Sequence, residues 1–480
     1  MSGRGKSLAR GSAWMLGSQA ITFLSQLVYV AVTSRLISAA GFGAYAVAAS
    51  VTALVGLLTN GGIAQAAMRA DRLSDRDSSS LTSIALLLGA GGAAFTVATA
   101  ELWGTIWGVP SASRLLIASA PILLLSPISL LAQGLVRRLG GFRLLALVSA
   151  SVSVVSLGIS AGLAVVMRDP ISLVIAPALT MFLTLVVLQA RTKALRRPRA
   201  LQRAVISHLQ FTWRVTVGGI LSYLGMNLPK FFITRSFGAP ELGVWNRAES
   251  AVLSPFQMLQ KALAQTIYPE LRNVTRSENT GNAAKFSDLL IVVSWVTVLP
   301  AALVAVLVPP LLPLFLGPEW QPAIQLAVAM AILAGLTAMT SILSSALEVA
   351  GKFKVTYASQ VVQILIVTTG CIAMLITGEI QLVIWGMIAA TVMRHTINLT
   401  AACRLGYADA RVLSRGYWGV ALGAVCVAAV VAGGVLVVVL HAPAWIAILY
   451  GFGVAGLGAI AFLVRERLPP IALARKYGLI

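Results

Sequence analysis

The chain has 480 residues, of which 58% are apolar and 11% charged, and its formal net charge is +21. Soluble domains average about 25% charged residues, so this composition excludes an ordinary soluble fold. The basic balance alone would suit a nucleic-acid-binding protein, but the cations are distributed among short loops between apolar segments. We therefore predict no nucleic-acid partner.

Apolar segments of membrane-spanning length recur along the whole chain. A transmembrane helix needs about 20 mainly apolar residues. We therefore expect an all-α polytopic membrane protein. The first apolar segment is longer than the apolar core of a signal peptide, about 7–15 residues, so we interpret it as an uncleaved span. The predicted spans, about fourteen, are 12–36, 42–67, 81–103, 114–136, 142–167, 171–190, 212–236, 241–268, 287–311, 322–350, 354–377, 380–403, 417–440 and 443–464.

The cations in the loops predict the orientation. If the N-terminus is cytoplasmic, 27 of the 36 lysine and arginine residues fall in cytoplasmic loops and four in outward loops. Such an excess on one side follows the positive-inside rule, so we expect both termini in the cytoplasm.

A segment near residue 35 is repeated 200 residues later. Arg35–Tyr45 aligns with Arg235–Trp245, and Ser50 aligns with Ser250 at the same offset. Repeated membrane helices are typical of secondary transporters, whose substrate site lies between the halves. The predicted organisation is an N-terminal six-helix lobe (1–190), a basic cytoplasmic linker (191–211), a second six-helix lobe (212–404), and two additional helices with a cytoplasmic tail (405–480).

The two copies of the repeat differ in charge. The first copy has Val47 and Gly61 where the second has Arg247 and Lys261. A cation at the centre of a span costs about 2.5–3.5 kcal/mol, so cations inside spans are expected to face protein or water. Cations at the two outermost residues of a span are counted with the adjoining loop. The five that remain within predicted spans are Arg214, Lys230, Arg247, Lys261 and Arg394.

Polar side chains follow single faces of several spans. Arg247, Ser254 and Lys261 are seven residues apart and therefore share one stripe of the eighth span. The first span also has a polar stripe, and we expect the first, second, seventh and eighth spans to line one central cavity with a cationic second-half wall. The alternative is that these groups are hydrogen-bonding contacts between helices. The candidate substrate-binding residues are Arg247, Lys261, Lys230, Asn227, Gln19, Gln26, Tyr29, Gln65 and Gln265.

Other residues give weaker predictions. Glu249 and Glu348 are candidate ion-coupling residues for protons or sodium, or else they pair with a nearby cation. Pro229 is expected to kink or break the seventh span. Gly158–Gly162 and Gly419–Gly423 have the spacing of helix-packing motifs.

The three cysteines and three histidines are scattered, so we predict no cofactor, no metal and no enzymatic activity.

The segment 235–249 and the motif Ile267-Tyr-Pro-Glu-Leu271 resemble the Wzx-type polysaccharide flippases. These belong to the multidrug/oligosaccharidyl-lipid/polysaccharide exporter superfamily. Gly41-Phe-Gly-Ala-Tyr45 is similar to the N-terminal counterpart in that family. Many members have an aspartate two residues after the asparagine of the seventh span. This chain has Asn227-Leu-Pro-Lys230 instead, which makes the expected cavity more positive.

The resemblance implies two six-helix bundles in a V shape that alternate access in the bacterial inner membrane. The implied substrate is an undecaprenyl-pyrophosphate-linked oligosaccharide for exopolysaccharide, capsule or O-antigen-like lipopolysaccharide biosynthesis. Arg247 and Lys261 suit its phosphates, and the glutamine and tyrosine side chains suit its sugars. Membrane lipids, a glycan polymerase and export machinery are the other expected partners. Two alternatives remain: a drug or metabolite exporter of the same superfamily, and a membrane glycan polymerase or ligase, which the short outward loops disfavour.

Overall fold

The computed structural model describes residues 2–60, 74–198, 212–276, 282–440, 450 and 453–454. Within these ranges the regular elements are helices, and none is a strand. A helix satisfies its backbone hydrogen bonds internally, which the bilayer requires of a spanning segment. The predicted class, an all-α polytopic membrane protein, is confirmed.

Ten helices in the described chain are long and apolar enough to cross a bilayer. They are α2 (Ala39–Asn60), α4 (Asp75–Ala98), α6 (Ala112–Arg138), α7 (Phe142–Met167), α8 (Ile171–Thr192), α12 (Asn282–Leu316), α13 (Ala323–Val349), α14 (Phe353–Thr377), α15 (Gln381–Arg404) and α16 (Ala410–Val439). Three further long helices are more polar: α1 (Ser2–Ser34), α10 (Thr212–Phe237) and α11 (Ala239–Arg276). These three carry most of the candidate binding residues. The short elements are α5 (Ala100–Trp107) and the 3₁₀ helix η1 (Pro318–Trp320).

The structure differs from two local predictions. The span expected at 81–103 ends earlier, because Thr99 leaves the helical region with φ −105° and ψ 7° and caps α4, after which α5 starts as a separate helix. The sequence predicts a kink or a break at Pro229; α10 continues through this residue without a break, and the kink stays a prediction. Prolines are tolerated in membrane helices where neighbouring groups satisfy the freed backbone atoms. The span expected at 443–464 lies almost entirely outside the described residues.

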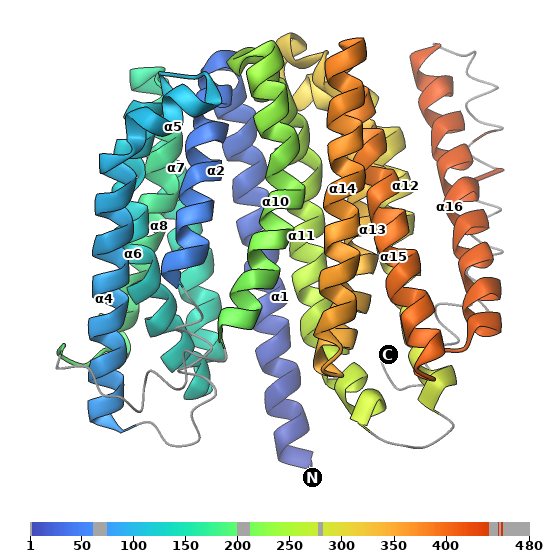
Figure 1. The fold of residues 1–480 in the computed structure, drawn as a ribbon, viewed down its shortest axis with the longest axis horizontal. Helices are drawn as coiled ribbons and strands as arrows, with labels where there is room; N and C mark the ends of the chain where they lie inside the picture. Colours follow the sequence, from blue (N-terminus) through green and yellow to red (C-terminus); the bar gives the residue numbers. More distant parts are fainter. Residues whose placement is uncertain are drawn as a thin grey trace. The chain divides into compact units, whose positions relative to one another are not determined.

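The chain divides into two compact units, Met1–Arg247 (unit 1) and Ala248–Ile480 (unit 2). In unit 1, α2 packs against α4, α6 and α10, while α1 packs against α7 (Figure 1, blue to green). In unit 2, α12 packs against α13 and α16, and α14 packs against α15 (Figure 1). The division falls inside α11 and not in the linker 191–211, so the lobes at 1–190 and 212–404 stay a prediction.

The two copies of the repeat cross each other closely within unit 1. A Cβ atom on Gly43 would lie 1.8 Å from the carbonyl oxygen of Ala239, and one on Gly243 would lie 1.9 Å from the carbonyl oxygen of Ala39. The two contacts are related by the same 200-residue offset as the sequence repeat. Only glycine allows backbones to approach this closely. The repeat is therefore also a reciprocal contact between the starts of α2 and α11, which we call the glycine crossing.

The two predicted glycine packing motifs have different outcomes. A Cβ atom on Gly423 would lie 2.5 Å from the ring of Trp295, so the second motif does receive a neighbouring helix. Gly158 and Gly162 have no atom of the described chain within 4 Å of such a Cβ. Their spacing matches the motif, but no described helix packs there, so the prediction for this pair is wrong.

Candidate substrate site

Arg247 of α11 lies beside the glycine crossing and is 5% exposed. Its Cζ atom is 3.7 Å from the centroid of the Phe42 ring, in cation–π geometry. Nη2 donates to Oδ1 of Asn246 at 3.1 Å, and Nη1 donates to Oγ of Ser34 at 3.4 Å. Nε is buried without a hydrogen-bond partner in the described structure. The guanidinium group is thus held by one aromatic ring and two neutral acceptors.

No carboxylate of the described residues forms an ion pair with Arg247. Tyr29 and Tyr45 lie within electrostatic range, but both are phenols. Burying a cation without a counter-charge is costly, so such a residue is seldom retained for packing alone.

The repeat supplies an internal reference for this position. Val47 is the counterpart of Arg247, and Leu242 is the counterpart of Phe42. Val47 and Leu242 are both fully buried members of one apolar core cluster in unit 1. The apolar pair of Val47 and Leu242 is therefore sufficient for packing on one side of the glycine crossing. Arg247 on the other side is not needed for packing, which indicates a role beyond folding.

Unit 1 contains a cavity of about 660 Å³ between α2, α6, α8 and α10. The described residues that line it carry no charge. Tyr45 lines this cavity and also lies within electrostatic range of Arg247, so the cavity and the buried cation share a neighbour. The polar lining residues are Tyr45, Thr52, Asn60, Ser119, Ser126, Ser222, Tyr223 and Asn227.

Hydrogen bonds fix several of these polar groups. Ser50 donates to Oδ1 of Asn227 at 3.1 Å, and the Tyr223 hydroxyl donates to the Ser50 carbonyl at 2.8 Å. Ser126 donates to Oδ1 of Asn60 at 3.0 Å. The result is a set of positioned amides and hydroxyls on neighbouring helices, a surface able to exchange hydrogen bonds with sugar hydroxyls.

The other candidate residues are distributed differently. Asn227 lines the cavity, whereas Lys230 is half-buried one turn further along α10 and is not part of the lining. Tyr29 accepts a hydrogen bond from Ser160 of α7 at 3.2 Å, which fits the helix-contact alternative. Gln19 and Gln26 are half-buried on α1 and do not line the cavity. Gln65 and the side chains of Lys261 and Gln265 lie outside the described part of the chain.

The described lining of this cavity draws on α2 and α10, as expected, and on α6 and α8 in place of α1 and α11. The predicted cationic wall from α11 is therefore not part of this cavity's described lining. The reason for the difference at α1 is that this helix packs against α7, which uses part of its polar stripe for helix contacts. The contributions of Ser119 and Ser126 were not predicted. A serine in an apolar span gives no sequence signal that separates a cavity wall from a helix contact.

A second arginine within a long helix, the half-buried Arg394 of α15, lies in a polar network in unit 2. Nη1 donates to Oε1 of Gln363 at 3.0 Å, and Nη2 donates to Oγ of Ser344 at 3.2 Å. Asn398 donates to the same Ser344 oxygen at 2.9 Å. Glu348 of α13 is half-buried and within electrostatic range of Arg394. These contacts tie α13, α14 and α15 together.

The same region of unit 2 contains His395. Its Nδ1 lies 3.3 Å from the Thr340 hydroxyl, and its Nε2 lies 3.1 Å from the Tyr417 hydroxyl. Both ring nitrogens are therefore engaged by hydroxyl groups.

Glu249, the other candidate ion-coupling residue, is half-buried on α11. Glu348 has Arg394 within electrostatic range but forms no ion pair with it among the described residues. Both ion coupling at either glutamate and its alternative, pairing with a cation, stay predictions.

Residues 32–325 match the family model described as polysaccharide biosynthesis protein. The chain belongs to this family. No curated protein matches the sequence.

Solved structures resemble the fold over most of the chain. The lipid II flippase MurJ in an inward closed conformation aligns with a TM-score of 0.68 and 12% identity, covering 95% of this chain and 99% of that chain. An outward-facing multidrug resistance MATE family transporter of the MOP superfamily aligns with 0.55 and 16%, covering 84% and 95%. A MOP superfamily transporter from Pyrococcus furiosus, described by the reverse polarity of its binding pocket, aligns with 0.50 and 15%, covering 87% and 96%. This member of the polysaccharide biosynthesis family therefore has the fold of MOP superfamily transporters.

Proposed function

We propose that the protein moves a lipid-linked oligosaccharide with an anionic pyrophosphate headgroup from the inner to the outer leaflet of the bacterial inner membrane. The observation that carries the proposal is Arg247, a buried cation without a carboxylate partner in the described structure, with one N–H group unsatisfied. A phosphate oxygen would supply both the missing acceptor and the missing negative charge.

The cavity in unit 1 is the proposed binding site for the oligosaccharide part of this substrate. Its volume of about 660 Å³ lies within the range of about 300–1,000 Å³ that is usual for small-molecule sites. Its neutral amides and hydroxyls suit sugar hydroxyls, which carry no charge to be matched. We assign Asn60, Tyr223 and Asn227 to sugar contacts and Arg247 to the headgroup. Lys230 and Lys261 remain candidate phosphate contacts.

Alternating access between the two halves of the repeat is the proposed route. The cytoplasm is electrically negative, so each negative charge moved outward gains about 2.3 kcal/mol per 100 mV. A headgroup with two negative charges can therefore be driven by the membrane potential alone. Proton or sodium coupling through Glu249 or Glu348 is the alternative source of energy. We further propose that a glycan polymerase and the export machinery receive the product.

A drug exporter is the rival function, since MATE structures share the fold. Exporters of cationic drugs need carboxylates in their cavities, and the described lining has none. The test uses the full-length protein in liposomes, with the potential clamped and no ion gradient. A fluorescent polyprenyl-pyrophosphate oligosaccharide is compared with an uncharged lipid-linked sugar and a cationic dye. We expect transport of the pyrophosphate lipid only, accelerated by an inside-negative potential. Transport of the dye without the pyrophosphate lipid would establish the rival.

A further inference from the structure

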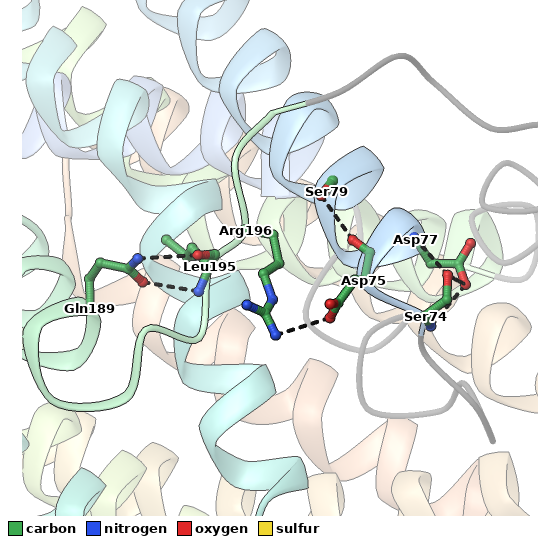
Figure 2. Close-up of polar contacts among 7 residues, drawn as sticks. All are labelled: Ser74, Asp75, Asp77, Ser79, Gln189, Leu195 and Arg196. Carbon is green, nitrogen blue, oxygen red and sulfur yellow. Dashed lines mark hydrogen bonds and ion pairs between the residues drawn. The ribbon is translucent and has the colours of Figure 1, made fainter.

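The basic segment after α8 is folded back onto that helix and is not an extended tether. Gln189 near the end of α8 holds Leu195 through two hydrogen bonds. Its Nε2 donates to the Leu195 carbonyl at 3.1 Å, and its Oε1 accepts from the Leu195 N–H at 3.0 Å (Figure 2). This pairing fixes the direction in which the following residues leave the helix.

The same segment is also fastened to the start of α4. Arg196 forms an ion pair with Asp75 at 3.0 Å, with side chains 53% and 80% exposed (Figure 2). The start of α4 does not depend on Asp75 for its cap, because Ser74 and Asp77 form a reciprocal capping box. The Asp75 side chain is therefore not needed to cap α4, and replacing it changes the local charge without removing the cap.

These contacts border an open pocket of about 950 Å³, which we call the α4–α8 pocket. Among its described lining residues, three are cations (Lys193, Arg196 and Arg197) and one is an acid (Asp75), which leaves two positive charges in excess in this part of the lining. The rest of its lining is mainly apolar, with Leu185, Val186, Ala190 and Leu195. The pocket thus combines a cationic part with an apolar part.

The apolar part continues along the surface of α8. Phe182 and Val186 are one turn apart on the same face, and they are 48% and 45% exposed. Ala190 continues that stripe, and Lys193 follows the helix directly, in the left-handed conformation that ends α8. One face of α8 therefore runs from exposed apolar side chains within the span to cations at its end. A free phosphate ion would use only the cations, whereas a phospholipid would use the whole stripe.

We propose that the α4–α8 pocket binds the phosphate headgroup of an anionic membrane phospholipid, with an acyl chain lying along Phe182 and Val186. The loop charges assign this end of the helices to the cytoplasm, so the lipid belongs to the inner leaflet. The pocket shares no lining residue with the cavity between α2, α6, α8 and α10. The proposal is independent of transport, because lipid binding is measured without any flipping step.

The experiment measures binding of fluorescent phosphatidylglycerol to the purified full-length protein in neutral detergent, with phosphatidylcholine as the uncharged competitor. Lys193→Gln combined with Arg197→Gln is expected to weaken binding about thirtyfold, which corresponds to about 2 kcal/mol. The matched control is Arg404→Gln combined with Arg411→Gln. It removes two exposed cations from the same predicted side without touching the pocket, and its affinity is expected to stay within about twofold of the wild type.

Asp75→Asn is expected to change the affinity for phosphatidylglycerol in the opposite direction, towards tighter binding. Misfolding would not increase the affinity. Removing the acid raises the excess to three positive charges, so phosphatidylglycerol is expected to bind about fivefold more tightly. Inorganic phosphate and pyrophosphate serve as headgroup-only competitors and are expected to displace the lipid poorly. The proposal is overturned if the pocket and control variants lose equal affinity, if Asp75→Asn binds no more tightly, or if pyrophosphate alone displaces the lipid at equal concentration.

Discussion

Two arginines within long helices, one in each unit, have different surroundings: Arg247 in unit 1 is buried, whereas Arg394 in unit 2 is half-buried. Arg394 in unit 2 donates to acceptors on two other helices and has the carboxylate of Glu348 within electrostatic range. Arg247 in unit 1 donates to its chain neighbour Asn246 and, at 3.4 Å, to Ser34, and it stacks on Phe42. Neither arginine forms an ion pair among the described residues, and Nε of each is buried without a hydrogen-bond partner. They differ in that Arg394 donates to two other helices and has a carboxylate within electrostatic range, whereas the titratable groups within electrostatic range of Arg247 are the phenols of Tyr29 and Tyr45.

This difference separates a structural cation from a candidate binding cation. Removing a partner from a buried polar network leaves the remaining groups unsatisfied, which costs stability. Removing a buried cation that has no counter-charge also removes its desolvation cost, so stability need not fall. Arg394 and Arg247 should therefore respond in opposite ways to the same substitution, and the predictions below test that contrast.

The largest effect is expected at the glycine crossing beside Arg247. Gly243→Ala places a Cβ atom 1.9 Å from the backbone oxygen of Ala39, a contact that no side-chain movement can relieve. We expect the free energy of unfolding to fall by more than about 3 kcal/mol, measured by denaturation of the purified protein in detergent. Gly91→Ala is the control, since its Cβ would meet no described atom within 4 Å. Equal stability of the two variants would mean that the crossing does not form.

Replacing Arg394 is expected to have the next largest effect. In Arg394→Met, Ser344 and Gln363 lose their charged donor, so unfolding should become easier by about 2–3 kcal/mol. Transport per folded molecule should persist, because the network is assigned a structural role. Arg404→Met, at an exposed position of the same helix, serves as the control. An Arg394→Met protein of normal stability that no longer transports would reverse the assignment.

A smaller effect is expected from the ring that covers Arg247. Phe42→Leu removes the cation–π contact, which contributes about 0.5–2 kcal/mol in other proteins. A double-mutant cycle with Arg247→Met isolates this coupling from the loss of ring packing. We expect a coupling free energy of about 1 kcal/mol in denaturant titrations. A value of zero would mean that the stacking does not hold the guanidinium group.

Bilayer thickness made the fold class predictable, because each span needs a long apolar segment whatever its neighbours are. The end of α4 at Thr99 was not predictable in this way, since apolar composition continues across it. The repeat contains glycines at positions 43 and 243, but the sequence does not predict that each glycine contacts the backbone of the other copy. That contact depends on how α2 and α11 pack.

The candidate site was predictable where charge was decisive. Arg247 stood out because a cation inside a span is costly. Neutral polar residues were harder to assign, since Tyr29 serves a helix contact and Ser126 lines a cavity with no difference in sequence pattern. Which face of a helix meets a cavity is decided by packing between helices that lie far apart along the chain.

The most direct test of the account is flipping of a lipid-linked pyrophosphate oligosaccharide by Arg247 variants in liposomes, beside an Arg404→Met control. We predict that Arg247→Met reduces flipping to the background of protein-free liposomes and leaves the unfolding free energy unchanged or higher. Arg247→Lys should keep partial activity, because lysine retains the charge without the paired donors. Flipping by Arg247→Met at the wild-type rate would contradict the account.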